Sequence, residues 1–210
     1  MGTTKSETNP TLNATQRSLG VRGDWMKIVK DTPDIETRRL LLKEVCIEDA
    51  PDIYAYTLNP NVLRYTTGTP PKAFSETESF VRGLVGNPAG DFAWAIRLKT
   101  GSAVIGVIEF DIRERRSASL DYALAERYWN QGIMTEAVRA VLDWAFRTYP
   151  TLESVHSSAL TANPASTRVQ QKCGMQFQRT ETQTWSKFDE PVELAFYSIS
   201  RAEWTGSTHS

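Results

Sequence analysis

The chain is short of the residues that bind metals and form disulfides. Its 210 residues include two cysteines, Cys46 and Cys173, and two histidines, His156 and His209. Two cysteines are too few for a disulfide framework, and their spacing does not match that of a zinc site. We therefore expect no metal centre and no scaffold held together by disulfides.

The sequence also has little net charge and no long apolar segment. Its 24 Lys and Arg residues nearly balance its 25 Asp and Glu residues, so no basic field favours nucleic acid. No apolar run approaches the roughly 20 residues that a membrane-spanning helix needs. The N-terminus lacks the apolar core of a signal peptide. These absences predict a cytoplasmic protein that binds neither nucleic acid nor a membrane.

What is present is the composition of one soluble domain with tails. Hydrophobic residues make up 40% and charged residues 23% of a chain too short for two full cores. The first residues are mostly Thr, Ser, Asn, Gly and charged residues, which predicts a disordered tail over 1–34. We expect the domain to span 35–204 and a second tail to span 205–210.

The hydrophobic patterns predict an order of helices and strands. Between Thr135 and Tyr149 apolar residues recur at i, i+3, i+4, i+7, i+8 and i+11, as in an amphipathic helix. A capping box, Ser75–Glu78, predicts the start of another helix, and the alternation over 92–98 predicts a half-buried strand. The predicted helices are 49–58, 75–84, 135–149 and 163–174, and the predicted strands are 36–42, 92–98, 103–112, 119–124, 154–160, 177–185 and 193–199. The order β-α-α-β-β-β-α-β-α-β-β predicts one α+β domain whose mixed central sheet has about six to seven strands flanked by helices.

The loop that joins strand 119–124 to helix 135–149 is the first candidate for a binding site. It runs directly into the helix, whose first N–H groups have no acceptor within the helix and face outward. Such a helix end can bind a phosphate, and Gly132 would allow a close approach of the backbone. The loop lacks the Gly-Lys-Ser/Thr ending of a P-loop, and it does not fit the G-x-G-x-x-G pattern of a dinucleotide-binding motif. From these residues alone, the loop either binds an anion or is a turn in which Gly132 precedes a capped helix.

A second stretch, 163–175 (NPASTRVQQKCGM), is explained by helix formation alone. Asn163 suits the N-cap, Pro164 suits the first turn, and Gly174 suits the residue after the helix. By itself this stretch requires no ligand.

Together and in this order, the stretches resemble the GNAT superfamily of acetyl-CoA-dependent N-acetyltransferases, from about residue 36 to residue 204. The resemblance rests on Tyr128–Ala137 (YWNQGIMTEA) and on the spacing of Asn163, Ser166, Lys172 and Gly174. With the opening Thr37–Leu42 (TRRLLL), these motifs look most like the Rim-type branch, which acts on ribosomal-protein N-termini. The resemblance implies a GNAT fold, acetyl-CoA as the co-substrate, an amine acceptor and no metal. Since many relatives dimerise, it also allows a homodimer.

The resemblance further implies how acetyl-CoA binds. The strand that ends at Leu124 and the strand near Ser157 would diverge, and the pantetheine arm would fill the gap. Main-chain groups over 122–124 would hold pantetheine and polarise the thioester, 131–135 would hold the pyrophosphate, and Asn163 would bind the pantetheine or acetyl end. This chain departs from the family's loop pattern at Trp129 and Met134, but we expect binding to survive because backbone N–H groups provide most of it. The residues expected to contact acetyl-CoA are Tyr122, Ala123, Leu124, Asn130, Gln131, Gly132, Ile133, Met134, Thr135, Asn163 and Ser166.

The catalytic groups are less directly indicated. The tyrosine acid of other GNAT branches falls at Gln170, which cannot supply a proton, and Ser166 looks like its Rim-type substitute. An amine that attacks a thioester must first lose a proton. We predict that Glu109 or Asp121 accepts it, with a solvated carboxylate as the alternative for each. Side-chain alternation places Asp121 opposite Tyr122, so Asp121 faces outward if the apolar residues of that strand face the helices.

The acceptor pocket of this fold usually forms near the first helix and the loop after it. The residues expected to contact the acceptor are Tyr56, Arg64, Tyr65 and, although it is mainly a core candidate, Trp94. The predicted activity is transfer of an acetyl group from acetyl-CoA to a primary amine, either a protein N-terminus or a small molecule, by direct attack in a ternary complex. Two alternatives stay open: a catalytically degenerate acyl-CoA-binding sensor or interaction domain, and a phosphate or nucleotide binder that uses the 131–135 loop.

Overall fold

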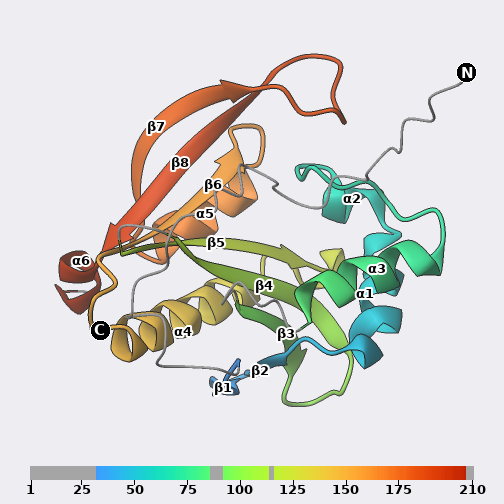
Figure 1. Cartoon of the computed structure of the whole chain (residues 1–210), viewed down its shortest axis with the longest axis horizontal. Coiled ribbons are helices and arrows are strands. Elements are labelled where there is room, and N and C mark those ends of the chain that lie inside the picture. Colours follow the sequence, from blue (N-terminus) through green and yellow to red (C-terminus); the bar gives the residue numbers. More distant parts are fainter. Residues whose placement is uncertain (1–31, 86–91, 114–115, 207–210) are drawn as a thin grey trace, which may run out of the picture.

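The computed structural model describes residues 32–85, 92–113 and 116–206 (Figure 1). The predicted N-terminal tail up to residue 31, the expected helix breaker at 87–90 and the last four residues lie outside the described residues. The strands are β1 (Ile35–Glu36), β2 (Leu40–Glu44), β3 (Phe92–Leu98), β4 (Val104–Arg113), β5 (Ser117–Leu124), β6 (Ser154–Leu160), β7 (Gln176–Gln183) and β8 (Val192–Ser200). The helices are α1 (Ala50–Thr57), α2 (Pro60–Leu63), α3 (Phe74–Leu84), α4 (Ile133–Thr148), α5 (Pro164–Lys172) and α6 (Arg201–Gly206), with short 3-10 helices at Ile47–Asp49 and Glu126–Tyr128.

The described strands form one mixed sheet, in the order β1-β2-β3-β4-β5-β6-β8-β7. All neighbours are antiparallel except β5 and β6, which are parallel. The α+β class and the mixed sheet are confirmed, but the sheet has eight strands rather than six to seven.

The additional strand arises because the segment 36–42 is not one strand. The chain turns after Glu36, so that Ile35 in β1 pairs with Leu42 in β2. Thr37 closes this turn, since its hydroxyl accepts a hydrogen bond of 2.9 Å from the N–H of Leu40. A side chain that bonds to the nearby backbone competes with strand pairing, and here it produces a hairpin.

The sheet is covered on both faces. Helix α4 packs on one face, against a core that includes Trp94, Ile108 and Leu120, and α1 and α3 cover the other face near Ala95 and Val107. Figure 1 shows α4 along one side of the strands and α1 with α3 on the other. Strand β3 is therefore buried on both faces over Phe92–Ile96, and the prediction of a half-buried strand is wrong because small alanines pack under α1 and α3.

Two helix starts also differ from the prediction. Helix α3 begins at Phe74 with Ala73 as its N-cap and no side-chain cap, so the expected capping box does not form. The carboxylate of Glu76 instead accepts a hydrogen bond of 3.0 Å from the N–H of Lys72. Helix α2 is not predicted; it forms because Asn59 caps it and Pro60 fits its first turn.

Helix α4 ends against the C-terminal part of the chain. The guanidinium of Arg201 donates to the carbonyls of Phe146 (2.7 Å) and Leu152 (2.9 Å), and also to that of Tyr149. The last carbonyls of a helix have no donor within it, and a cation there also complements the helix dipole. Arg201 thus closes α4 from the start of α6, a helix that continues two residues past the predicted domain end at 204. Among the described residues, no helix combines the length and the apolarity needed to cross a membrane.

The contact between β4 and β5 leads to a stability prediction. Gly106 is buried, and a Cβ atom at this position would lie 2.5 Å from the carbonyl oxygen of Ala123. Because that oxygen belongs to a paired backbone, Gly106→Ala should lower the free energy of unfolding by about 1–3 kcal/mol. A suitable control is Gly83→Ala in α3, where no atom lies within 4 Å of the new Cβ. The control should raise stability by about 0.5–1 kcal/mol. Chemical denaturation measures both values, and equal stabilities would contradict the packing.

Candidate active site

The central feature of the site is the divergence of β5 and β6. They pair only over Ser117–Ser119 and Ser154–His156. Further along, β6 continues to pair with β8 as far as Leu160, and β5 continues to pair with β4 as far as Leu124. The expected separation of the two strands is therefore confirmed.

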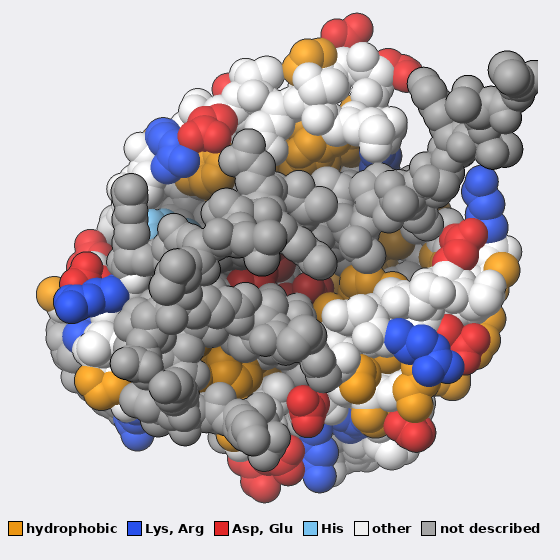
Figure 2. All heavy atoms as spheres, in the orientation of Figure 1, with side chains coloured by type: hydrophobic (Ala, Val, Ile, Leu, Met, Phe, Trp, Pro, Cys, Tyr) orange, Lys and Arg blue, Asp and Glu red, His pale blue; other side chains and the backbone are white. Residues whose placement is uncertain are grey.

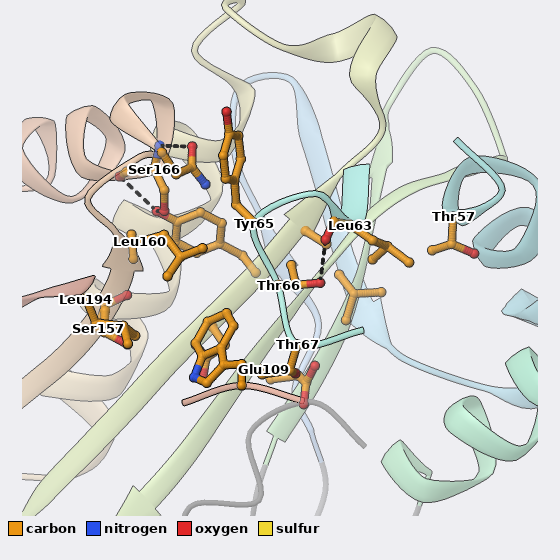
Figure 3. A pocket seen from close by; sticks show the side chains of 18 of the residues that line it. Thr57, Leu63, Tyr65, Thr66, Thr67, Glu109, Ser157, Leu160, Ser166 and Leu194 are labelled. Atoms are coloured by element: carbon orange, nitrogen blue, oxygen red, sulfur yellow. Dashed lines mark hydrogen bonds between the residues drawn. The ribbon is translucent and has the colours of Figure 1, made fainter. Parts of the chain in front are cut away.

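A cleft lies at this divergence. It is bounded by β4, β5, β6, the start of α5, helix α1, the connection after α2 and the segment between β7 and β8. Figure 3 shows Tyr65, Glu109 and Ser166 around the same space. The predicted site residues that line this cleft are Tyr56, Tyr65, Glu109, Asp121, Tyr122, Ala123, Asn163 and Ser166.

Two hydroxyl groups meet at the β5–α5 side of the cleft. The phenol oxygen of Tyr122 lies 2.8 Å from Oγ of Ser166 and 3.1 Å from its carbonyl oxygen. Asn163 positions Ser166, because its side-chain oxygen accepts a hydrogen bond of 3.3 Å from the Ser166 N–H at the first turn of α5. Burial raises the pKa of the Tyr122 phenol, and the hydrogen bond with Ser166 only partly offsets this. Tyr122 therefore keeps its proton at neutral pH.

The side chain of Tyr122 is a functional candidate that the sequence did not indicate. Its backbone was expected to bind pantetheine, whereas the alternation along β5 groups its ring with the apolar residues Leu120 and Leu124. The ring reaches α5 because β6 has moved away at this height. An aromatic residue three positions after the last β5–β6 residue pair was the signal that could have indicated it.

Gln170, where the resemblance expects a tyrosine acid, has a structural contact. It is buried, and its Nε2 donates a hydrogen bond of 2.9 Å to Oγ of Ser157 on β6. Ser157 itself lines the cleft. Gln170 thus supports the β6 wall from behind.

Carboxylates lie on the opposite side of the cleft. Glu109 on β4 stands opposite Asp121 on β5 in the strand register, and Asp111 follows Glu109 on the same face. Asp121 faces away from α4, as the alternation predicts, but this outward face is the one that carries the cleft. Figure 2 shows acidic side chains in the middle of this face, over β4 and β5. Burial and the nearby Glu109 charge raise the pKa of Tyr56.

The loop before α4 has the backbone conformation of an anion site. Asn130 and Gly132 both have positive φ, 58° and 72°. The N–H of Glu136 is the first that bonds back along the helix, to the carbonyl of Gly132 at 3.0 Å. The N–H groups of the preceding helical residues therefore have no acceptor within α4. The side chains of Ile133 and Met134 are buried in the core, which leaves their main-chain groups for a ligand.

The rest of the loop region is supported by hydrogen bonds within the chain. Gln131 is exposed, and its amide donates to the carbonyl of Arg127 at 2.8 Å. The carbonyl of Thr135 accepts a weak contact from the thiol of Cys173 at 3.6 Å. The carbonyl of Leu124, expected to face pantetheine, already accepts a hydrogen bond of 2.7 Å from the Trp129 indole. Trp129, a departure from the family pattern, thus closes the loop against β5.

The loop is also held by the β1–β2 turn, a contact that the sequence did not predict. Arg39 donates from Nε to the carboxylate of Glu136 at 2.6 Å and from Nη1 to the carbonyl of Gln131 at 2.9 Å. Thr37 donates to the same carboxylate at 2.6 Å. Partial burial would raise the pKa of Glu136, but these hydrogen bonds and the Arg39 charge lower it overall. Glu136 thus stays ionised and ties the turn to the first turn of α4.

The residues expected to contact the acceptor fall into three groups. Tyr56 and Tyr65 line the cleft, whereas Arg64 is exposed and stacks on the Tyr65 ring at 5.3 Å from its centre. The prediction that Trp94 lines the cleft is wrong. Its ring has no exposed surface and packs against Trp144 on the α4 side of the sheet, and its indole N–H donates to the carbonyl of Pro33 at 2.7 Å.

Cys173 does not have the properties of a nucleophile. Burial raises the pKa of its thiol to about 12, and a thiol reacts as its thiolate. Within the described residues, no three His, Cys, Asp or Glu side chains form a group suited to a metal ion.

Three known proteins illustrate the similarity. The chain is 26% identical, over 81% of its length and 98% of the relative, to a Bacillus subtilis (strain 168) protein named "Uncharacterized N-acetyltransferase YnaD". An acetyltransferase (GNAT family) from Bacillus anthracis has a TM-score of 0.73 at 21% identity, covering 81% of this chain and 99% of that one. Spermidine N-acetyltransferase from Vibrio cholerae, solved with CoA and spermine, has a TM-score of 0.69 at 18% identity, covering 80% and 99%. The two solved structures show that the fold is shared.

The family itself follows from a family model. The model described as "Acetyltransferase (GNAT) domain" matches residues 39–176, which is more than half of the chain. The matched part contains the Arg39 contact, the cleft-lining faces of β4, β5 and β6, the loop before α4 and all of α5. By this match the chain belongs to the GNAT acetyltransferase family.

Proposed function

We propose that this protein transfers an acetyl group from acetyl-CoA to a primary amine by direct attack in a ternary complex. The observation that carries the proposal is the cleft at the β5–β6 divergence, which has a hydroxyl pair on one side and carboxylates on the other. Known relatives named N-acetyltransferases support the same chemistry.

Acetyl-CoA would bind along the edge of this cleft. Its pyrophosphate suits the N–H groups at the start of α4, where Asn130 and Gly132 have positive φ. Its pantetheine arm suits the gap between β5 and β6, where the main-chain groups of Tyr122 lie beyond the last β5–β6 residue pair and can hydrogen-bond to it. Asn163, which holds the first turn of α5, would contact the acetyl end.

The acceptor arrives mostly as an ammonium ion and must lose a proton before it attacks. Glu109 and Asp121 are the candidates for this step, because both line the cleft from neighbouring strands. Their negative charge also favours the approach of the cationic form. The neutral amine nitrogen then forms a bond to the thioester carbon.

The C–S bond breaks as the intermediate collapses, and the sulfur leaves as a thiolate that needs a proton. Tyr122 would donate this proton, with Ser166 as its hydrogen-bond partner at 2.8 Å. The nitrogen loses its second proton to water, and water in turn reprotonates the Tyr122 oxygen. The products are the amide and CoA with a free thiol. This assigns Ser166 a shared role with Tyr122, where the sequence indicated Ser166 alone.

The acceptor class has two sources of support. The motifs of the Rim-type branch favour a protein N-terminus, and the Vibrio cholerae relative is named for spermidine. The test is acetyl-CoA-dependent thiol release with a panel of hexapeptides that begin with alanine or serine, spermidine and glucosamine. Release with one class supports the enzyme and identifies its acceptor. Binding of acetyl-CoA without release from any of these amines would favour the sensor alternative.

The loop geometry leads to a binding prediction. Gly132→Trp should abolish acetyl-CoA binding, because φ is 72° there and a bulky side chain would stand over the N–H groups of α4. Gly101→Trp is the matched control, since no atom lies within 4 Å of a Cβ at that turn. Calorimetry with acetyl-CoA measures both affinities. Unchanged affinity in Gly132→Trp would exclude the loop as the pyrophosphate site.

The hydroxyl pair leads to a kinetic prediction. Tyr122→Phe removes the proposed proton donor and should lower kcat by about 100-fold or more. Ser166→Ala removes its partner and should lower kcat by about tenfold, with little change in acetyl-CoA affinity. Thr167→Ala is the control, because this neighbouring α5 position is half-buried and its hydroxyl donates to the Pro164 carbonyl rather than to the pair. If the two hydroxyls act as a unit, the double variant loses less than the product of the two single effects. A kcat that is unaltered in Tyr122→Phe would remove this residue from the mechanism.

A further inference from the structure

Lys187 makes an unusual contact across the mouth of the cleft. It lies in the segment between β7 and β8, in a turn closed by a hydrogen bond of 3.0 Å from the Phe188 N–H to the Trp185 carbonyl. Its ammonium donates to the carbonyls of Thr66 (3.1 Å) and Gly68 (2.9 Å), and to that of Leu63. The carbonyl of Arg64 lies at 3.4 Å. One cation is thus surrounded by four carbonyls of a single segment, residues 63–68, which we call the acceptor-side segment.

The acceptor-side segment is irregular and depends on contacts of this kind. Apart from the last residue of α2, it belongs to no helix or strand, so its carbonyls lack the partners that regular structure provides. Within it, the Thr66 hydroxyl donates to the Leu63 carbonyl at 3.0 Å and accepts from the Gly68 N–H at 3.2 Å. The ammonium adds donors for the Thr66 and Gly68 carbonyls, which these local bonds do not use, and hydrogen bonds from a charged donor are about twice as strong as neutral ones.

The same segment forms one wall of the cleft. Leu63, Tyr65, Thr66 and Thr67 line it, as does Trp185, two residues before the lysine. Figure 3 shows Tyr65, Thr66 and Thr67 along this wall. The hydroxyl oxygen of Thr67 is buried and has no hydrogen-bond partner among the described residues, so a bound acceptor can supply one.

The other end of α2 is held from a different direction. The carboxylate of Glu126, at the start of the segment that leads to the α4 loop, accepts a hydrogen bond of 2.9 Å from the Asn61 amide and another from Asn59. Loss of Lys187 would therefore release the acceptor-side segment while α2 stays attached. In the part of the chain that the structure describes, the hydrogen bonds of the Lys187 ammonium all go to residues 63–68 and none to the α4 N-terminus or α5, so the acetyl-CoA side would be unaffected.

We infer that Lys187 is a positioning residue for the acceptor: it fixes the acceptor-side segment, and with it Tyr65 and Thr67, in the conformation that binds the amine. This inference rests on the proposed function, because it takes the cleft as the acceptor site. Partial burial lowers the pKa of Lys187, which is consistent with an ammonium held inside the wall.

The variant Lys187→Met keeps the aliphatic stem and removes the charge and the three N–H donors. Lys187→Arg keeps charge and donors, and Lys72→Met is the control, since Lys72 is exposed on the same α2–α3 connection. Hydrogen exchange of the ligand-free chain should show faster exchange over 64–68 in Lys187→Met and no change over α4. For the amine of the panel that the enzyme acetylates, Lys187→Met should raise the KM about tenfold or more. The KM for acetyl-CoA should stay within about twofold, and Lys187→Arg should recover part of the loss.

The two readouts separate the inference from the proposed function. Unchanged exchange over 64–68, or an unchanged acceptor KM in Lys187→Met, would overturn the inference. An equal rise in the KM of acetyl-CoA would also overturn it, because the effect would then be a general loss of structure. If the wild-type chain acetylates none of the panel amines, the proposed function fails, and exchange alone decides whether Lys187 holds the segment. Should Lys187→Met not fold, the same comparison is made between Lys187→Arg and the wild type.

Discussion

The active-site cleft depends on one constraint: β5 and β6 each complete their pairing with a different neighbour. Strand β5 keeps its partner β4 over its whole length, and β6 keeps β8, so the two strands share only three residue pairs. Beyond these pairs, two edges with unpaired main-chain groups face each other. Buried backbone groups require partners, and here a ligand or a side chain such as Trp129 can supply them. The Tyr122 ring reaches α5 through the same opening.

Much of the fold could be predicted from local patterns. Helix α4 was predictable because its apolar stripe faces a large core, and a periodic pattern that long has few other interpretations. The β1–β2 hairpin was not, because the turn depends on a single Thr37 hydroxyl inside a pattern typical of a strand. The capping box at Ser75–Glu78 failed because α3 begins at Phe74, which places Ser75 inside the helix, and Glu76 bonds to the Lys72 N–H just before it. Such competing local bonds have similar energies, and only the folded chain selects among them.

The candidate site divides in the same way. The loop before α4 and the start of α5 were predictable, because short-range backbone preferences at Gly132 and Asn163 determine their shape. Contacts between distant parts of the chain were not. Arg39 supports the loop from 92 residues away, and Lys187 reaches its carbonyls across 119 to 124 residues. Trp94 was misplaced because alternation alone does not tell which face of a sheet is covered by the larger core.

The contact of Arg201 with α4 has a consequence for how the chain completes its fold. The last carbonyls of α4 are satisfied by a side chain 55 residues after Phe146. A nascent chain on the ribosome therefore holds α4, the most regular helix, before it holds the group that closes its end. Until Arg201 has been synthesised, the Phe146 carbonyl lacks this donor and can bond to water instead, and the end of the helix is free to fray. Translation thus supplies this contact to α4 only after β6, α5, β7 and β8 have been made.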